Sequence, residues 1–145
     1  MKKIIIINGP NLNLVGNREK EIYGKINIIE YLDNLKKKFK KKIKIKIYFL
    51  NNEGDIIELL QNIYKKKNIF GLIINAGAYS HTSLAISDTI RYIKNKIKII
   101  EVHISNIYNR EKIRHKSLIS PNINYGIILG FGLKGYYIAI LSLIK

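Results

Sequence analysis

The chain has 145 residues, 47% of them hydrophobic, which is enough for one domain with a buried core and too few for a (β/α)8 barrel of about 250 residues. It has no cysteine, so disulfides, zinc–thiolate sites and cysteine nucleophiles are excluded. The formal charge of +16 is typical of nucleic-acid binders, but only four of the 26 basic residues are arginines and the lysines fall in runs that solvated faces explain, so we expect no nucleic-acid partner.

Five segments have the patterns of β-strands. Ile4 to Ile7 is a continuous apolar run, which fits a strand buried on both faces. From Ile43 to Phe49 apolar and polar residues alternate, which indicates a strand with one solvated face at the edge of a sheet. Phe70 to Ile74 is again apolar throughout and belongs in the centre. Ile97 to His103 and Tyr125 to Leu129 complete the set.

Helical patterns separate these strands. Asn27 opens the first with the spacing of a capping box, and apolar residues then recur every three to four positions. Gly54-Asp55 opens the second, either Thr82 or Ser83 caps the third, and Leu133 to Ile144 is a terminal helix.

Strands that alternate with helices of this length indicate βαβ units, in which a parallel sheet carries helices on both faces. Five strands with a polar second strand match an α/β flavodoxin-like three-layer sandwich with the order 2-1-3-4-5, in one domain over residues 1–145. In such sheets ligands bind beyond the carboxyl ends of the strands. Polar or titratable residues follow the first, third and fourth strands, in residues 8–23, 75–81 and 101–106.

Two histidines stand at these strand ends. His81 and His103 are of the type best suited to proton transfer near neutral pH, although each singly also fits an ordinary hydrogen-bonded histidine. Glu101 precedes His103 by two residues, so an extended backbone puts both side chains on one face, either as a catalytic pair or as a surface ion pair. Asp88 lies two helical turns after His81, and it is either a solvated helix acid or an acid that faces the site or a neighbouring subunit.

The loop after the first strand carries the most unusual combination. Asn8 to Asn13 is rich in amides, and Tyr23 follows with Arg18 five positions before it. A nearby guanidinium favours the ionised form of a phenol, whose ordinary pKa is about 10. Tyr23 is therefore either a packing residue or a base. Arg18, Arg110 and Arg114 all lie in the segments singled out here, where a planar guanidinium suits a bound anion.

Two further patterns were considered as cofactor or metal sites, and neither indicates one. Gly130 to Gly135 matches G-x-G-x-x-G, but only ten residues follow, too few for the next strand and acid of a dinucleotide site, so we interpret these glycines as a tight turn before the terminal helix. The histidines and acids show no metal-ligand spacing such as His-x-x-x-His, so we expect no metal.

Four ordered motifs together span nearly the whole chain. They are Asn8 to Leu14 with Gly16, Arg18-Glu19 and Ile22-Tyr23-Gly24; Asn75 to Tyr79 with His81-Thr82-Ser83; Glu101 to Asn106; and Arg110-Glu111 with Arg114 and Ser120-Pro121. In combination they resemble the type II 3-dehydroquinate dehydratases, small flavodoxin-like enzymes of the shikimate pathway.

The resemblance implies cofactor-free removal of water from 3-dehydroquinate through an enolate. Tyr23, ionised beside Arg18, would take the proton, and His103 would protonate the departing hydroxyl. The substrate-binding positions it implies are Asn75, His81, Asp88, Ile104, Ser105 and Arg114, with Asn11 and Glu101 in support.

The resemblance also implies assembly as trimers stacked into dodecamers, with Asp88 reaching the site of an adjacent subunit. We expect a cytoplasmic protein with no membrane partner, because four isoleucines after Met-Lys-Lys are too few for a secretory signal and no apolar run approaches 18 residues. Two alternatives remain from the residues alone: a flavin-binding module that uses the loop over residues 8–23, and a nucleic-acid binder that uses the lysines.

Overall fold

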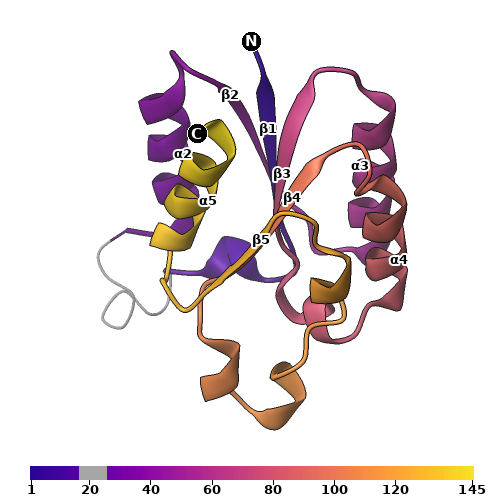
Figure 1. Cartoon of the computed structure of the whole chain (residues 1–145). Helices are drawn as coiled ribbons and strands as arrows, with labels where there is room; N and C mark the ends of the chain where they lie inside the picture. The colour runs from indigo at the N-terminus through magenta and orange to yellow at the C-terminus, as the bar shows by residue number, and fades with distance from the viewer. Residues whose placement is uncertain (17–25) are drawn as a thin grey trace.

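The computed structural model describes residues 1–16 and 26–145, and the strands among them form one parallel sheet (Figure 1). The order is β2-β1-β3-β4-β5, which confirms the predicted order and the predicted edge position of the alternating strand. The strands are β1 (Lys3–Asn8), β2 (Lys44–Phe49), β3 (Ile69–Asn75), β4 (Lys98–His103) and β5 (Gly126–Leu129).

Helices cover both faces of this sheet, and Figure 1 shows α2 and α5 on one side and α3 and α4 on the other. Their bounds are α2 (Ile28–Phe39), α3 (Glu53–Lys65), α4 (Leu84–Ile93) and α5 (Lys134–Ile144). Short 3-10 turns lie at η1 (Leu12–Leu14), η2 (Gly77–His81), η3 (Ile107–Asn109), η4 (Lys112–Arg114) and η5 (Ser120–Asn122). In the parts of the chain that the structure describes, no helix has both the length and the hydropathy that a bilayer crossing requires.

The apolar run of β1 divides between two cores, because successive side chains of a strand point to opposite faces. Ile4 and Ile6 pack with α2 and α5, whereas Ile5 and Ile7 pack with α3 and α4. All four are at most 3% exposed. A central strand with helices on both sides therefore needs the continuous apolar sequence that β1 has.

The helix starts agree with the capping residues read from the sequence in two cases. The side chain of Asn27 accepts a hydrogen bond from the backbone N–H of Glu30 at 2.9 Å, and Ser83, not Thr82, caps α4 by accepting from Ile86 at 2.9 Å. The second helix differs slightly, since α3 begins at Glu53, one residue before the expected Gly54-Asp55 start.

The loops after β1 and β3 approach each other closely at the point where the strand order reverses. Gly9 donates its backbone N–H to the carbonyl of Asn75 at 2.7 Å. A Cβ at Gly9 would lie 2.3 Å from the carbonyl oxygen of Ala76, so this contact requires glycine. The approach brings the polar segments that follow β1 and β3 to one edge of the sheet.

Candidate active site

A cleft of about 460 Å³ opens at the carboxyl ends of β1, β3 and β4. Segments far apart in the sequence meet there, as expected for the edge where the strand order reverses. Seven of the residues selected from the sequence line it: Asn11, Asn75, His81, His103, Ile104, Ser105 and Arg114.

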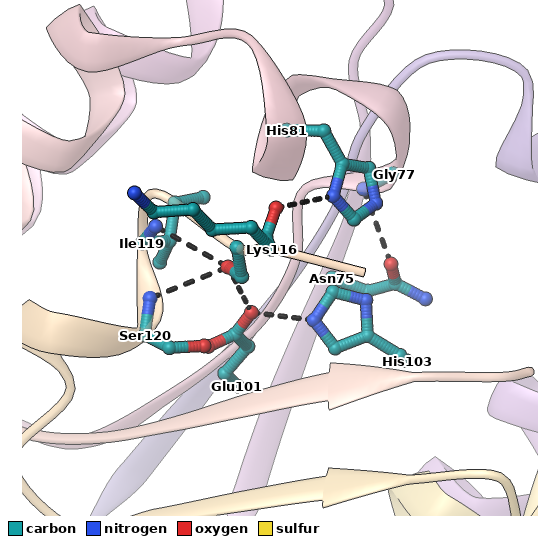
Figure 2. A network of polar contacts seen from close by, with 9 residues as sticks. Asn75, Gly77, His81, Glu101, His103, Lys116, Ile119 and Ser120 are labelled. Atoms are coloured by element: carbon teal, nitrogen blue, oxygen red, sulfur yellow. Dashed lines mark hydrogen bonds and ion pairs between the residues drawn. The ribbon is translucent and has the colours of Figure 1, made fainter. Parts of the chain in front are cut away.

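His103 and Glu101 form a buried pair at the end of β4. Both side chains point to the same side of the strand, and the ring Nε2 of His103 hydrogen-bonds Glu101 Oε2 (Figure 2). The two side chains are only 6% and 1% exposed. The sequence left open a surface ion pair at this position, and the burial excludes it.

The environment of Glu101 favours its carboxylate. Burial by itself would raise the pKa of this group, but the hydrogen bond and charge of His103, together with the hydroxyls of Ser120 and Ser117, outweigh burial and hold the pKa below its ordinary value. A carboxylate can only accept at Oε2, so the Nε2 of His103 carries a proton. Nδ1 is then the nitrogen of His103 that remains for proton exchange.

His81 stands opposite, at the end of η2. Its Nδ1 lies 2.8 Å from the carbonyl oxygen of Lys116, and because a carbonyl only accepts, Nδ1 carries the proton. The ring centroids of His81 and His103 are 6.2 Å apart, with 32° between the ring planes. The two rings therefore lie side by side along the cleft, each held through one nitrogen (Figure 2).

A buried hydroxyl fixes the carboxamide of Asn75. Tyr136 of α5 donates to Asn8 Oδ1 at 2.6 Å and accepts from Asn75 Nδ2 at 2.9 Å. Asn75 Oδ1 in turn accepts from the backbone N–H of Gly77 at 3.2 Å. Burial raises the pKa of Tyr136, so its hydroxyl stays protonated. The orientation of the Asn75 amide is thus set by its partners, and Tyr136 is not among the residues selected from the sequence.

Two arginines bring positive charge to the cleft. Arg114 and Arg110 both line it, at the two ends of a short connection that contains Glu111. Glu111 Oε1 lies 2.9 Å from Arg114 Nε and 3.4 Å from Arg110 Nε, and these ion pairs tie the two guanidinium groups to one carboxylate. The sequence singled out Arg110 as a rare arginine and gave it no place in the site. The cleft is therefore suited to an anionic ligand.

The segment after β4 is held by a glycine turn. Gly130 donates its N–H to the carbonyl of His103 at 3.3 Å, and Gly132 donates to that of Ile104 at 2.9 Å. Both glycines have positive φ, of 86° and 60°. These contacts confirm that the G-x-G-x-x-G pattern is a turn, and they show that this turn supports the wall of the cleft.

Asn11 is the one non-glycine residue with positive φ in the described ranges, at 66°. Asparagine tolerates this conformation better than most residues. Its backbone N–H donates to Asn51 Oδ1 at 3.1 Å. The amide-rich loop after β1 is thereby fixed against the loop after β2, with Asn11 at the cleft.

Asp88 lies away from the other selected residues. It is an exposed residue of α4, 3.4 Å from Arg91, and it lines a separate cleft of about 540 Å³ between α3 and α4. Within its own chain it is therefore a solvated helix acid, the first of the two interpretations that the sequence allowed.

Tyr23 and Arg18 lie outside the described residues. The ends of the described chain on either side of them are adjacent: Ile28 donates its N–H to the carbonyl of Val15 at 3.2 Å, and the backbone of Gly16 packs against Asn27. Val15 itself lines the cleft. The segment that carries Tyr23 and Arg18 thus leaves and rejoins the described structure beside the cleft.

No group of three or more histidines or acids suited to a metal ion occurs in residues 1–16 and 26–145. The polar lining instead combines imidazoles, amides and guanidinium groups. Such a set suits proton transfer and the binding of an oxygen-rich anion.

Comparison with known proteins agrees with this arrangement. The sequence model of the family described as dehydroquinase class II matches residues 2–144. The chain belongs to the class II dehydroquinases. Relatives of the chain include the 3-dehydroquinate dehydratases of Caldicellulosiruptor saccharolyticus and Caldicellulosiruptor bescii, which are 49% and 46% identical over 144 residues, with 99% of this chain and 97% of each relative covered.

The solved structures give the same family. The type II dehydroquinase from Butyrivibrio crossotus matches with a TM-score of 0.90 at 46% identity, over 99% of this chain and 98% of that one. The resemblance inferred from the sequence motifs is thereby confirmed, and the chain is an enzyme of the lyase class.

Proposed function

We propose that this class II dehydroquinase removes water from 3-dehydroquinate to give 3-dehydroshikimate, without a cofactor, as a step of the shikimate pathway. The observation that carries the proposal is the buried Glu101–His103 pair, which opens onto a cleft with Arg114 at the edge where the strand order reverses. The family and the names of the relatives support the choice of substrate.

Tyr23 is the base in this proposal. As a phenolate it takes the proton from the carbon alpha to the ketone, and the electron pair of the broken C–H bond forms an enolate. Arg18 stabilises the phenolate, because a neighbouring positive charge lowers the pKa of a phenol. The described residues that flank their segment support this proposal, because Val15 lines the cleft and Ile28 donates its N–H to the carbonyl of Val15.

His103 is the acid. The enolate collapses, the C–O bond to the leaving hydroxyl breaks, and the proton on His103 Nδ1 passes to that oxygen, so that water leaves. Glu101 holds Nε2 and stabilises the positively charged ring before transfer. General acid catalysis of this kind contributes about 10²–10⁴-fold to a rate.

The remaining residues bind the substrate. Arg114 pairs with the substrate carboxylate, because a guanidinium offers two parallel donors to the two oxygens. His81 accepts a hydrogen bond from a substrate hydroxyl at Nε2, since its Nδ1–H donates to the carbonyl of Lys116. The other proposed binding positions are Asn75, Ile104 and Ser105, with Asn11 in support.

Asp88 enters this proposal through assembly. Following the family resemblance, we propose that Asp88, which lies outside the cleft of its own chain, reaches the cleft of an adjacent subunit in a trimer, and that trimers stack into a dodecamer. The α3–α4 surface that carries Asp88 also holds the exposed Tyr92, whose ring packs on Tyr64 at 5.0 Å, and such a surface suits an interface. We also propose that the enzyme works in the cytoplasm.

The test of this function is direct. Purified protein is mixed with 3-dehydroquinate, and the ultraviolet absorbance of the conjugated enone in the product is followed. We expect the absorbance to rise at a rate proportional to protein concentration. Borohydride added during turnover should leave no adduct on the protein, because the mechanism forms no Schiff base. An unchanged absorbance with folded protein would contradict the proposal.

A further inference from the structure

The far side of the Glu101 carboxylate is occupied by two serines. Ser117 Oγ donates to Glu101 Oε2 at 2.7 Å, and Ser120 Oγ donates to Oε1 at 2.5 Å. With His103 on Oε2, three donors converge on one carboxyl group, and Figure 2 shows His103 and Ser120 beside it. The mechanism above uses the carboxylate but assigns neither serine a part.

The direction of the Ser117 hydroxyl is fixed by the backbone. Its oxygen accepts the N–H groups of Ile119 at 3.2 Å and of Ser120 at 3.3 Å. A hydroxyl has a single proton, and with its lone pairs engaged by two amides that proton is left for Glu101. The 3-10 turn η5 thus aims an O–H at the carboxylate before any substrate binds.

Three donors leave no place for a proton on the carboxyl group. A protonated Glu101 would turn an O–H toward Ser117, Ser120 or His103, and one of the hydrogen bonds of this carboxyl group, which is 1% exposed, would be lost. The serines therefore hold Glu101 as an acceptor, and an accepting Glu101 requires the N–H form of His103 Nε2. The proton to be transferred is then confined to Nδ1.

We propose that Ser117 and Ser120 are positioning residues for the His103 proton donor, which they keep in one tautomer by fixing Glu101. The inference rests on the proposed function for its catalytic meaning. Its structural part, the tautomer of His103, is independent of which substrate the cleft takes.

Ser120 is the better residue for a test. It lines a second cleft, of about 490 Å³, which also borders His103, so removing its hydroxyl enlarges an open space and leaves no closed cavity. Ser117 is 8% exposed and accepts two backbone bonds, so its truncation also loosens η5. Ser142 of α5 is a matched control, because it is exposed and its hydroxyl donates only to the carbonyl of Ile138 in the same helix.

Other charged groups near Glu101 can also contribute to the pH profile of kcat. Besides the pair itself, the titratable or charged groups that line the two clefts around it are His81, Tyr108, Arg110, Arg114, His115 and Lys116. None of them is altered by the serine variants, so a shift between variants reports on Glu101 and His103.

The experiment compares Ser117→Ala, Ser120→Ala and Ser120→Thr with Ser142→Ala. Nitrogen-15 NMR of the imidazole rings in the free protein measures the tautomer of His103. We expect only the Nε2–H form in the unchanged protein, in Ser120→Thr and in Ser142→Ala, and a mixture of tautomers in Ser117→Ala and Ser120→Ala. In turnover, Ser120→Ala should lower kcat by about tenfold with KM unchanged, and the acid limb of the kcat profile should move up by about one pH unit.

The outcomes separate the two proposals. A single His103 tautomer in Ser120→Ala, with an unmoved acid limb, would overturn the positioning role, even if the variant melts earlier. A mixed tautomer in the alanine variants of a protein that shows no dehydratase activity would support the tautomer control and count against the proposed function instead.

Discussion

His81 and His103 lie with their ring centroids 6.2 Å apart, and each ring has one nitrogen engaged, on opposite sides of the imidazole. His81 uses Nδ1 on the Lys116 carbonyl, and His103 uses Nε2 on Glu101. The nitrogens left for a ligand are therefore Nε2 of His81 and Nδ1 of His103. The same residue type thus serves two tasks, since one ring offers a lone pair and the other, when charged, a proton.

Replacing His103 should stop the chemical step and spare binding. We expect His103→Asn to lower kcat by about 10²–10⁴-fold, the usual contribution of a general acid, with KM changed much less. Steady-state kinetics beside a thermal melt would separate lost chemistry from lost folding. Near-normal kcat in a folded variant would remove His103 from the role of acid.

Arg114 should act on binding. We expect Arg114→Lys to raise KM by about 10–100-fold, because a lysine cannot make the paired hydrogen bonds of a guanidinium and each hydrogen bond to a charged group is worth about 1.5–3 kcal/mol. Lys112→Ala, an exposed cation two residues away, should change KM by less than about twofold. Equal effects of the two variants would mean that only general positive charge matters.

The Tyr136 hydroxyl should be a large contributor to stability. Tyr136→Phe leaves two buried amides, Asn8 and Asn75, each without one partner, and we expect the free energy of unfolding to fall by about 1–3 kcal/mol. Tyr125→Phe also loses one hydroxyl, but from an exposed bond to the Ser142 carbonyl, and should cost less than about 0.5 kcal/mol. Denaturant unfolding of both variants measures the difference, and equal losses would argue against a special role of the buried hydroxyl.

The carboxylate of Glu101 should make the free energy of unfolding depend on pH in the acid range. Its pKa in the folded state is held below the ordinary value, so the unfolded chain binds the proton first as the pH falls. The stabilisation is complete above the ordinary glutamate pKa and is lost as the pH drops through the lower, folded value. We expect Glu101→Gln to unfold more easily by about 1–3 kcal/mol at pH 7 and to match the unchanged protein at the acid end. A difference that stays constant with pH would show that the charge of Glu101 is not what matters.

The fold was predictable because its signals are local. The apolar run of β1, the alternation before Phe49 and the caps at Asn27 and Ser83 each depend on a few neighbouring residues, and the structure confirms them. The start of α3 was misplaced by one residue, because Asn52 makes no capping bond that would mark it and Glu53 is as good a helix residue as those after it.

The site was predictable to the extent that its residues sit at strand ends. His81 and His103 were placed together by topology alone, before any distance was known. Tyr136 was missed because its partner Asn8 is 128 residues away, and no local pattern reports such a contact. The available signal was a tyrosine in a mostly apolar helix, and it was weak because Tyr137 stands beside Tyr136 in the same helix. Arg110 was noticed for its rarity, but its direction into the cleft depends on the turns between Ile107 and Arg114.

The assignments of Tyr23 and Arg18 rest on the motifs and the family, and turnover by Tyr23→Phe tests the central claim most directly. The phenylalanine ring keeps the shape of the side chain and removes only the oxygen that accepts the proton. We predict that the folded variant forms the enone product at least about 10²-fold more slowly than the unchanged protein, with its melting temperature preserved. Product formation at the unchanged rate would contradict the account, because another group would then be the base.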